Sequence, residues 1–356
     1  MAVLNEEQEM LRDMAREWST NESPVAEFRK VRASGAPEAF NPDAYKAMSE
    51  MGWTGVIIPE EHGGSDFGWM SVGLIVEELG KTLTASPLIA STLAASAIIL
   101  GGSDEQKSKW LPKIASGELI ATLAIDEGPH HNPANIATSV SGGKLSGTKA
   151  FVHEAHTADL FVVSANDGLY LVENGDSVSL STRKLTDQRS HAEVTFDGAV
   201  ADKLEGGGDD LLDHVLDRAR IITACEMLGM AQRVFDTTLD YLKQRVQFNQ
   251  VLASFQALQH RMADLFGELA TMRSAVEGGL MALDAGFRVP EAACIAKARA
   301  SDVLHLISRE GVQLHGGMGM TDEYDIGLYL KRARILEASW GTSSYLRNRF
   351  ANLSGY

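Results

Sequence analysis

Cysteine and positive charge are both scarce in this chain of 356 residues. The two cysteines, Cys225 and Cys294, are too few for a disulfide framework, and neither has a metal-ligand spacing such as Cys-x-x-Cys. Lys and Arg number 32 against 48 Asp and Glu, and the resulting net charge of −16 would repel a phosphate backbone. The composition argues against a uniformly basic nucleic-acid binder, so we expect no nucleic-acid partner. The default location is the reducing cytoplasm.

Targeting and membrane segments are also not predicted. The N-terminus is acidic and has no basic segment followed by an apolar one, so no signal peptide is predicted. Residues 82–103 carry no charge and are long enough to cross a bilayer, but they include Pro87, several hydroxyl side chains and a closing Gly-Gly. This pattern favours a buried helix over a membrane span.

Hydrophobic periodicity divides the chain into three parts. We expect a fold of class α+β, mostly α, with an N-terminal helical domain at 1–119, a central antiparallel β domain at 120–204 and a C-terminal four-helix bundle at 209–356. Three glycines at 206–208 form the clearest linker. The helices expected in the bundle cover residues 209–247, 255–285, 290–312 and 331–353.

Two segments of the bundle have residues suited to phosphate binding. Arg245 ends a long predicted helix shortly before Phe248, and a guanidinium and an aromatic ring together can hold a pyrophosphate and a base. The alternative is a surface arginine and a core phenylalanine. In the second segment, Gly316, Gly317 and Gly319 allow a backbone to approach an anion closely. No strand precedes these glycines, so the alternative is a helix end followed by a turn.

Further motifs occur in a fixed order along the chain. They are Ile-Pro-Glu-Glu-His-Gly-Gly at 58–64, Val-Glu-Glu-Leu-Gly at 76–80, Gly-Glu at 117–118, Leu-Ser-Gly-Thr-Lys-Ala-Phe-Val-His at 145–153, Arg-x-Gln-Phe at 245–248, Phe-Gln-x-x-Gln at 255–259, Gln-x-x-Gly-Gly-x-Gly at 313–319 and Gly-Thr at 341–342. In this order and spacing the chain resembles the acyl-CoA dehydrogenases, and the resemblance covers nearly its whole length.

The resemblance implies an FAD-dependent oxidoreductase that desaturates an acyl-CoA thioester between its α and β carbons, in fatty acid or steroid catabolism. In that family a carboxylate removes the α-proton while a hydride passes to the flavin, and an electron-transfer flavoprotein accepts the electrons. The substrate would be an acyl-CoA whose acyl group the sequence does not identify. The family also implies a homo-oligomer, or a hetero-oligomer with a second acyl-CoA dehydrogenase subunit.

The resemblance also assigns roles to residues of this chain. Arg245 would hold the FAD pyrophosphate, in this family usually that of a neighbouring subunit. Arg220 would lie near the substrate thioester; its alternative is a helix-surface cation paired with Asp217 or Glu226. The remaining cofactor-binding residues would be Phe248, Gln256, Gln313, Gly316, Gly317, Phe151 and Thr342.

This sequence departs from the family where the catalytic base is expected. The usual position, before Gly341, holds Trp340, and the position used by a minority of members holds Ala219. Neither an indole nor a methyl group accepts a proton. The flavin-facing run at 124–133 also differs strongly, His153 replaces a hydroxyl residue, and a glycine after the Arg245 motif has become Asn249.

Other carboxylates are candidates for the base. Glu226 lies two helical turns beyond Ala219, and burial there would raise its pKa. The alternative is a structural glutamate paired with Arg220 or Arg233. Weaker candidates are Asp126, Glu127 and Glu337. The adjacent His130 and His131 suggest a metal only superficially, since neighbouring loop histidines usually point apart, and we expect no metal site.

Three functions remain open at this point. The chain could be a self-sufficient acyl-CoA dehydrogenase with an unusual base such as Glu226. It could be the base-deficient subunit of a heteromeric enzyme, because the run at 319–332 resembles the bacterial branch that degrades steroids and dicarboxylates. It could also be a flavin-free scaffold or binding protein, although Arg245 and the glycines argue against that.

Overall fold

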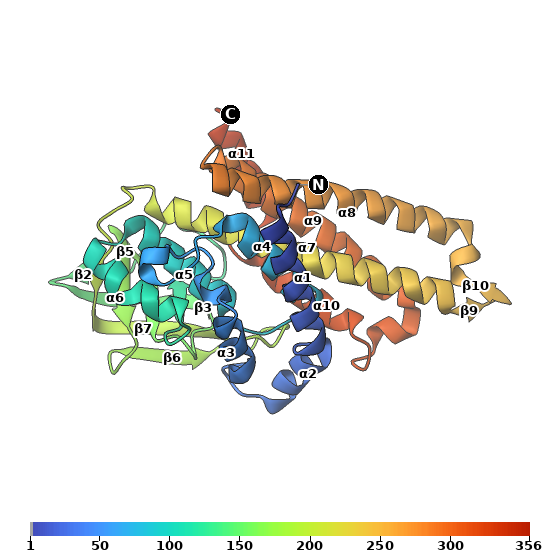
Figure 1. Ribbon diagram of the computed structural model, residues 1–356, viewed down its shortest axis with the longest axis horizontal. Coiled ribbons are helices and arrows are strands. Elements are labelled where there is room, and N and C mark those ends of the chain that lie inside the picture. The colour runs from blue at the N-terminus through green and yellow to red at the C-terminus, as the bar shows by residue number, and fades with distance from the viewer. Residues whose placement is uncertain (1–2) are drawn as a thin grey trace. The chain divides into compact units, whose positions relative to one another are not determined.

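Six helices form most of the first third of the protein, whose computed structural model describes residues 3–356 (Figure 1). Asn5 begins the first helix and Ser103 the sixth, each through a capping box in which the side chain accepts a backbone N–H. The six helices are α1 (Glu6–Asn21), α2 (Val25–Ser34), α3 (Pro42–Glu50), α4 (Gly68–Lys81), α5 (Leu88–Gly101) and α6 (Asp104–Ala115).

The long uncharged stretch forms α5, a helix of 14 residues of which most are buried. It contacts the neighbouring helix α6 and the first strand of the β region. The prediction of a buried helix is therefore confirmed. Among residues 3–356 no helix is long and apolar enough to cross a membrane.

The β region consists of two four-stranded sheets, ordered β1-β4-β5-β8 and β2-β3-β7-β6. All pairs are antiparallel except β1 with β4, which are parallel because the chain between them passes through the other sheet. The sequence did not predict that parallel pair. The strands are β1 (Ala121–Ala124), β2 (Ser139–Ser141), β3 (Lys144–His153), β4 (Leu160–Ala165), β5 (Gly168–Glu173), β6 (Val178–Thr182), β7 (His191–Val200) and β8 (Asp202–Lys203).

The core of the β region is formed by side chains from both sheets. Phe161 of β4 and Phe196 of β7 meet edge to face with ring centroids 5.7 Å apart. Every residue of β4 is buried, whereas buried and exposed residues mix along β3. The alternation in β3 is what a sheet with one solvated face requires.

Five helices and one short hairpin form the last part of the chain. They are α7 (Leu211–Gln244), β9 (Val246–Gln247), β10 (Gln250–Val251), α8 (Gln256–Ala285), α9 (Val289–His315), α10 (Ile326–Ala338) and α11 (Ser343–Leu353). The predicted fold class is confirmed, but the single helix expected at 331–353 is wrong. The chain breaks there because Trp340 and Gly341 adopt positive φ values of 59° and 107°, and Thr342 then caps α11.

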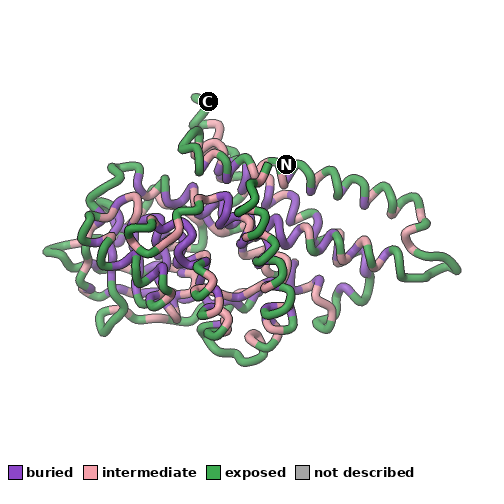
Figure 2. The backbone as a smooth tube through the Cα atoms, viewed as in Figure 1, coloured by how far each residue is buried: buried purple, intermediate pink, exposed green. Residues whose placement is uncertain are grey.

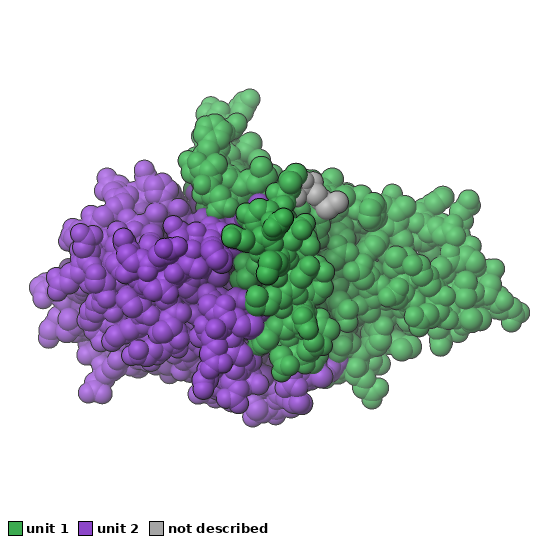
Figure 3. All heavy atoms as spheres, viewed as in Figure 1, with its two compact units in different colours: residues 1–25, 73–84, 220–356 green, residues 26–72, 85–219 purple. Residues whose placement is uncertain are grey.

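The chain forms two compact units (Figure 3). The first comprises residues up to 25, 73–84 and 220–356; the second comprises 26–72 and 85–219. These units interleave along the sequence, and the three-domain division at 1–119, 120–204 and 209–356 stays a prediction. Within the first unit, the backbones of α4 and α7 approach closely at Gly229. A Cβ there would overlap the carbonyl oxygen of Glu77, so the position requires glycine.

Candidate functional site

The first candidate region lies at one end of the C-terminal helices, where α7 ends, α8 begins and α9 ends (Figure 1). Arg245 directly follows α7, and its carbonyl accepts the N–H of Leu252 at 2.8 Å, which closes the β9–β10 hairpin. The tip of this hairpin is exposed (Figure 2). Phe248 is 82% exposed, so the interpretation of a core phenylalanine is wrong.

The hairpin turn explains why an asparagine can replace the family's glycine. Phe248 and Asn249 have φ values of 54° and 63°, as the two-residue turn between β9 and β10 requires. Asparagine is one of the few residues besides glycine that adopt this conformation readily. The departure at Asn249 therefore leaves the turn intact, and the turn holds the Phe248 ring in solvent.

The glycine segment ends α9 beside the same hairpin. The rings of Tyr241, one turn before Arg245, and His315, at the end of α9, lie 4.3 Å apart. Gly316 has φ 61° and ends the helix, as the turn interpretation required, yet nothing lies within 4 Å of a Cβ placed on Gly316 or Gly317. The structure thus brings the Arg245 and glycine segments together and leaves open space over the glycine backbone. Gln256 and Gln313 are exposed at the same end.

The second candidate region surrounds the break between α10 and α11. Arg220 is fully buried, and its Nε donates to the carbonyl of Trp340 at 3.1 Å. Its guanidinium lies 5.9 Å from the ring of Tyr345. The alternative of a helix-surface cation is therefore wrong for Arg220. Trp340 itself is buried and cannot accept a proton.

Glu226 has a partner that sequence reasoning did not name. Arg332 of α10 donates to both of its carboxylate oxygens, from Nε at 2.8 Å and from Nη2 at 3.1 Å. The expected partners, Arg220 and Arg233, were wrong. A buried carboxylate with both oxygens bound to one guanidinium must leave that ion pair before it can remove a proton.

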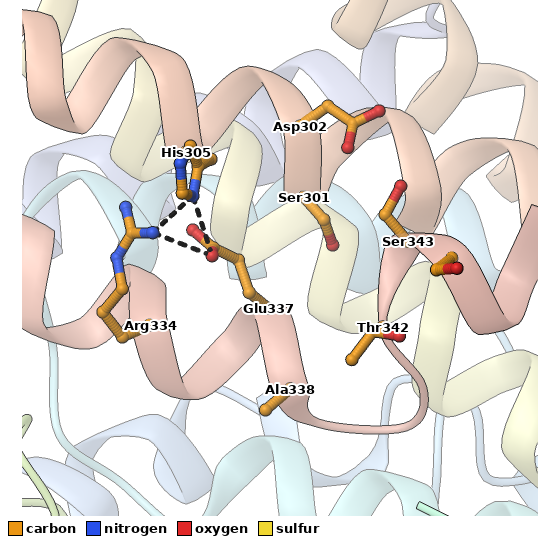
Figure 4. A pocket seen from close by; sticks show the side chains of 9 residues that line it. Ser301, Asp302, His305, Arg334, Glu337, Ala338, Thr342 and Ser343 are labelled. Carbon is orange, nitrogen blue, oxygen red and sulfur yellow. Dashed lines mark hydrogen bonds and ion pairs between the residues drawn. The ribbon is translucent and has the colours of Figure 1, made fainter.

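A cavity of about 620 Å³ lies between α9, α10 and the start of α11 (Figure 4). His305 and Arg334 both contact the Glu337 carboxylate on its wall, each at 3.1 Å, and Thr342 and Ser343 face them from the other side. Three buried polar atoms of this wall have no hydrogen-bond partner within the described chain: Glu337 Oε1, Arg334 Nε and Ser343 Oγ. Such atoms fit a polar ligand that offers both donors and acceptors.

Lys297 lies behind this cavity and is fully buried. Its Nζ lies 3.1 Å from the hydroxyl of Ser301, which lines the cavity. Burial lowers the pKa of Lys297 to about 7; the Glu337 carboxylate opposes this shift, and the charge of Arg220 adds to it. A lysine inside an apolar helix run was the sequence signal for this residue, and the sequence interpretation missed it.

The flavin-facing run of the β region is held by its own polar contacts. Burial would raise the pKa of Glu127, but hydrogen bonds from Lys149, Thr138 and the backbone N–H of Ala137 outweigh it and lower the pKa to about 2. Asp126 binds Nδ1 of His131 at 2.9 Å. Across residues 3–356 there is no group of three or more metal-ligating side chains that could hold a metal ion.

Two ring side chains of the β region, Phe151 and His153, are at least partly exposed. Phe151 occupies a bulge of β3 at φ 53° and is 37% exposed. The ring of His153, two residues later, lies 4.6 Å from that of His191. The ring of His153 therefore contacts another ring of the β region.

The two regions of the C-terminal helices are far apart in one chain. Arg220 and Arg245 are 25 residues apart along α7 and its last turn, about 37 Å at 1.5 Å per residue. That distance exceeds the diameter of a small domain. Arg220 and Arg245 therefore lie in separate regions of the chain.

Comparison with known proteins decides the family. The model of the acyl-CoA dehydrogenase N-terminal domain matches residues 5–118, and that of the acyl-CoA dehydrogenase C-terminal domain matches residues 206–353. The chain belongs to the acyl-CoA dehydrogenase family. As a member it is a flavoprotein oxidoreductase with FAD as its cofactor, and the open glycine backbone and the unpartnered polar atoms fit such a group.

Several relatives cover almost the entire chain. The acyl-CoA dehydrogenase IpdE2 of Mycolicibacterium smegmatis is 32% identical over 333 residues, 93% of each chain. The acryloyl-CoA reductase (NADH) of Anaerotignum propionicum is 30% identical and covers 96% of this chain and 92% of its own. Among solved structures, the Tcur3481-Tcur3483 steroid acyl-CoA dehydrogenase has a TM-score of 0.92 at 29% identity, with 98% of each chain covered. The ChsE4-ChsE5 complex of Mycobacterium tuberculosis, at 22% identity, shares the fold with a TM-score of 0.91 over 100% of this chain and 99% of its own.

Proposed function

We propose that this chain is the base-deficient subunit of a heteromeric acyl-CoA dehydrogenase, which desaturates an acyl-CoA thioester. The observation that carries the proposal is the side chain at the family's base position: Trp340, buried and held in a left-handed conformation. Ala219 stands at the minority position, and Glu226 is bound to Arg332 through both oxygens. The second subunit would therefore supply the carboxylate that removes the α-proton.

The cofactor residues of this chain divide into two groups. FAD, when bound, supplies the hydride acceptor. The exposed end of the helices would hold an adenosine diphosphate: Arg245 would grip the pyrophosphate with two parallel hydrogen bonds, and Phe248 would cover the base. The other members of this group are Gln256, Gln313, Gly316 and Gly317.

The second group would contact a different cofactor molecule. Phe151 would pack against a flavin ring from the β region, and Thr342 would offer its hydroxyl from the cavity wall between α9 and α11. Arg220, proposed beside the substrate, and Arg245 lie about 37 Å apart along one helix, and in the proposed assembly the Arg245 group serves an FAD held mainly by another subunit. This separation supports an oligomer in which two subunits complete each cofactor site.

The named relatives support the heteromeric form and the substrate class. One is a steroid acyl-CoA dehydrogenase named after two components, and another is a complex of two proteins. We propose an acyl-CoA with a steroid-derived acyl group as the substrate, Arg220 as a residue near its thioester, and an electron-transfer flavoprotein as the electron acceptor. The cytoplasm is the proposed location.

A second candidate function rests on Glu226. This carboxylate is buried on the helix that carries Ala219, so a self-sufficient dehydrogenase with Glu226 as its base needs only that the Arg332 ion pair opens during the reaction. A flavin-free scaffold is less well supported, because the open glycine backbone and the exposed Arg245 have no use in it.

The test compares the chain purified alone with the chain co-purified with a second acyl-CoA dehydrogenase subunit. We expect substoichiometric FAD in the isolated chain, full FAD in the complex, and anaerobic bleaching of the flavin by steroid acyl-CoAs only in the complex. Full FAD and rapid bleaching in the isolated chain would favour the Glu226 enzyme instead. A colourless complex would support the scaffold.

A further inference from the structure

A second cavity lies within the unit that contains the β region. Its volume is about 460 Å³. One wall is the end of α2 and the loop that follows it, and the other wall is the connection between β6 and β7. None of the residues assigned to FAD or to the acyl-CoA above lines it.

The wall of this cavity concentrates positive charge in a chain of net charge −16. Arg32 comes from α2, whereas Arg183, Lys184 and Arg189 come from the β6–β7 connection. No carboxylate lines the cavity among the described residues. Arg32, Arg183 and Arg189 also have partners within the chain.

Two acids stand beside these cations but outside the cavity wall. Glu193 binds Arg183 at 2.6 Å, and Asp187 accepts the backbone N–H of Arg189 at 3.3 Å. Lys184 is exposed and forms no ion pair within residues 3–356. The side of the cavity formed by Lys184 therefore keeps its positive charge, which favours an anion.

The inner wall is formed by buried side chains. Arg189 is only 6% exposed, and its guanidinium lies 4.8 Å from the ring of Phe28. The ring of His191, also buried, lies 4.6 Å from that of His153. Gln188 holds a left-handed φ of 56°, a conformation that non-glycine residues adopt at a cost and that concentrates at ligand sites.

We propose that this cavity, here named the α2–β6 pocket, binds the phosphoryl groups of a small anionic ligand. A carboxylate is satisfied by one arginine, whereas a phosphoryl dianion or a pyrophosphate uses several forked donors. The volume is within the range of pockets that enclose a nucleotide-sized molecule. The pocket is independent of the proposed function, because it uses none of the cofactor or base positions.

Calorimetric titration of the FAD-loaded complex, freed of unbound FAD, with inorganic pyrophosphate tests the proposal. The bound FAD occupies the Arg245 region, which could otherwise bind the probe. We expect saturable binding of one pyrophosphate that Lys184→Glu weakens about tenfold or more, through the loss of one charge-assisted contact. Lys144→Glu is the matched control: Lys144 is also exposed in the β region and changes the net charge equally, but it is not in the pocket wall.

The outcomes separate the assignment from its alternatives. Absence of saturable heat in the wild type overturns the proposal, as does equal weakening by Lys184→Glu and Lys144→Glu. Loss of binding in Arg245→Ala but not in Lys184→Glu would assign the anion to the cofactor region and also overturn it. Tighter binding of malonate than of pyrophosphate contradicts a phosphoryl site. Tighter binding of ADP than of pyrophosphate identifies the source of the phosphoryl groups as a nucleotide, and the reverse order identifies a free phosphate compound.

Discussion

The C-terminal helices match the acyl-CoA dehydrogenase pattern at one end and depart from it near the other. Around Arg245 the hairpin, the aromatic ring and the glycine backbone are all in place, and even the replacement Asn249 fits its left-handed turn. Around Trp340 the base is missing, and Glu226 is bound to Arg332. This difference between the two ends is the basis of our proposal that the chain is one subunit of a heteromeric enzyme.

The largest expected effect concerns Glu226. We expect Glu226→Gln to lower the free energy of unfolding by about 3–5 kcal/mol, because it removes the buried carboxylate that pairs with Arg332, whose side chain is only 12% exposed. Urea denaturation measures this. The double variant Glu226→Gln/Arg332→Met is the control and should recover much of the loss, since it removes both charges of the pair. A loss below about 1 kcal/mol in the single variant would argue against a structural ion pair.

Arg245→Ala tests the other end of the helices. Loss of a bidentate contact to a phosphate costs about 1.5–3 kcal/mol, which weakens FAD binding about 10- to 150-fold. Fluorescence titration of the apo-complex with FAD measures the change. Arg12→Ala, which removes a surface arginine of α1, should leave the affinity unchanged. Equal FAD affinity of Arg245→Ala and wild type in every assembly would show that Arg245 does not hold FAD.

Lys297, which lies behind the cavity between α9, α10 and α11, should make the stability of the protein depend on pH. Because its pKa is about 7 in the fold and near its ordinary value of 10.5 in the unfolded chain, the unfolded state binds more protons between these values. Stability should therefore rise with pH from about 7 to 10, by at most about 1.4 kcal/mol per pH unit from this residue. The difference between wild type and Lys297→Met, measured by urea denaturation at pH 7, 8 and 9, isolates the contribution. Parallel curves would show that Lys297 does not titrate in this range.

The smallest effect concerns the hairpin turn. Asn249→Ala should destabilise the left-handed turn by about 1 kcal/mol, whereas Asn249→Gly should be neutral or slightly favourable. Hydrogen exchange of the Leu252 amide, which closes the hairpin, reports the change locally. Faster exchange in both variants would mean that the asparagine side chain, not its backbone conformation, holds the turn.

The helical and strand pattern predicted most of the fold because its cause is local. The uncharged apolar stretch at 82–103 indicated α5, and the change of periodicity near residue 120 indicated the strands. The parallel pairing of β1 with β4 was missed because it depends on how two sheets exchange strands. The break at Trp340 was missed because a tryptophan does not normally indicate a left-handed residue.

The candidate site, like the fold, was predicted from the sequence only in part. The resemblance to the family predicted one site for Arg245 and the glycines, and their segments do lie at the same end of the helices. The pairing of Glu226 with Arg332 joins residues 106 positions apart, and burial of Arg220 depends on tertiary packing. No local pattern carries that information, so the partners named for Glu226 and the surface position considered for Arg220 were wrong.

Turnover by the isolated chain shows most directly whether this chain has a catalytic base of its own. The chain, loaded with FAD and without any second subunit, is mixed with steroid acyl-CoAs and an artificial electron acceptor. A chain without its own base should give no turnover above the rate of free FAD, and full turnover after the second subunit is added. Turnover of the isolated chain on the order of 1 s⁻¹ that Glu226→Gln abolishes, while the variant remains folded, would contradict it.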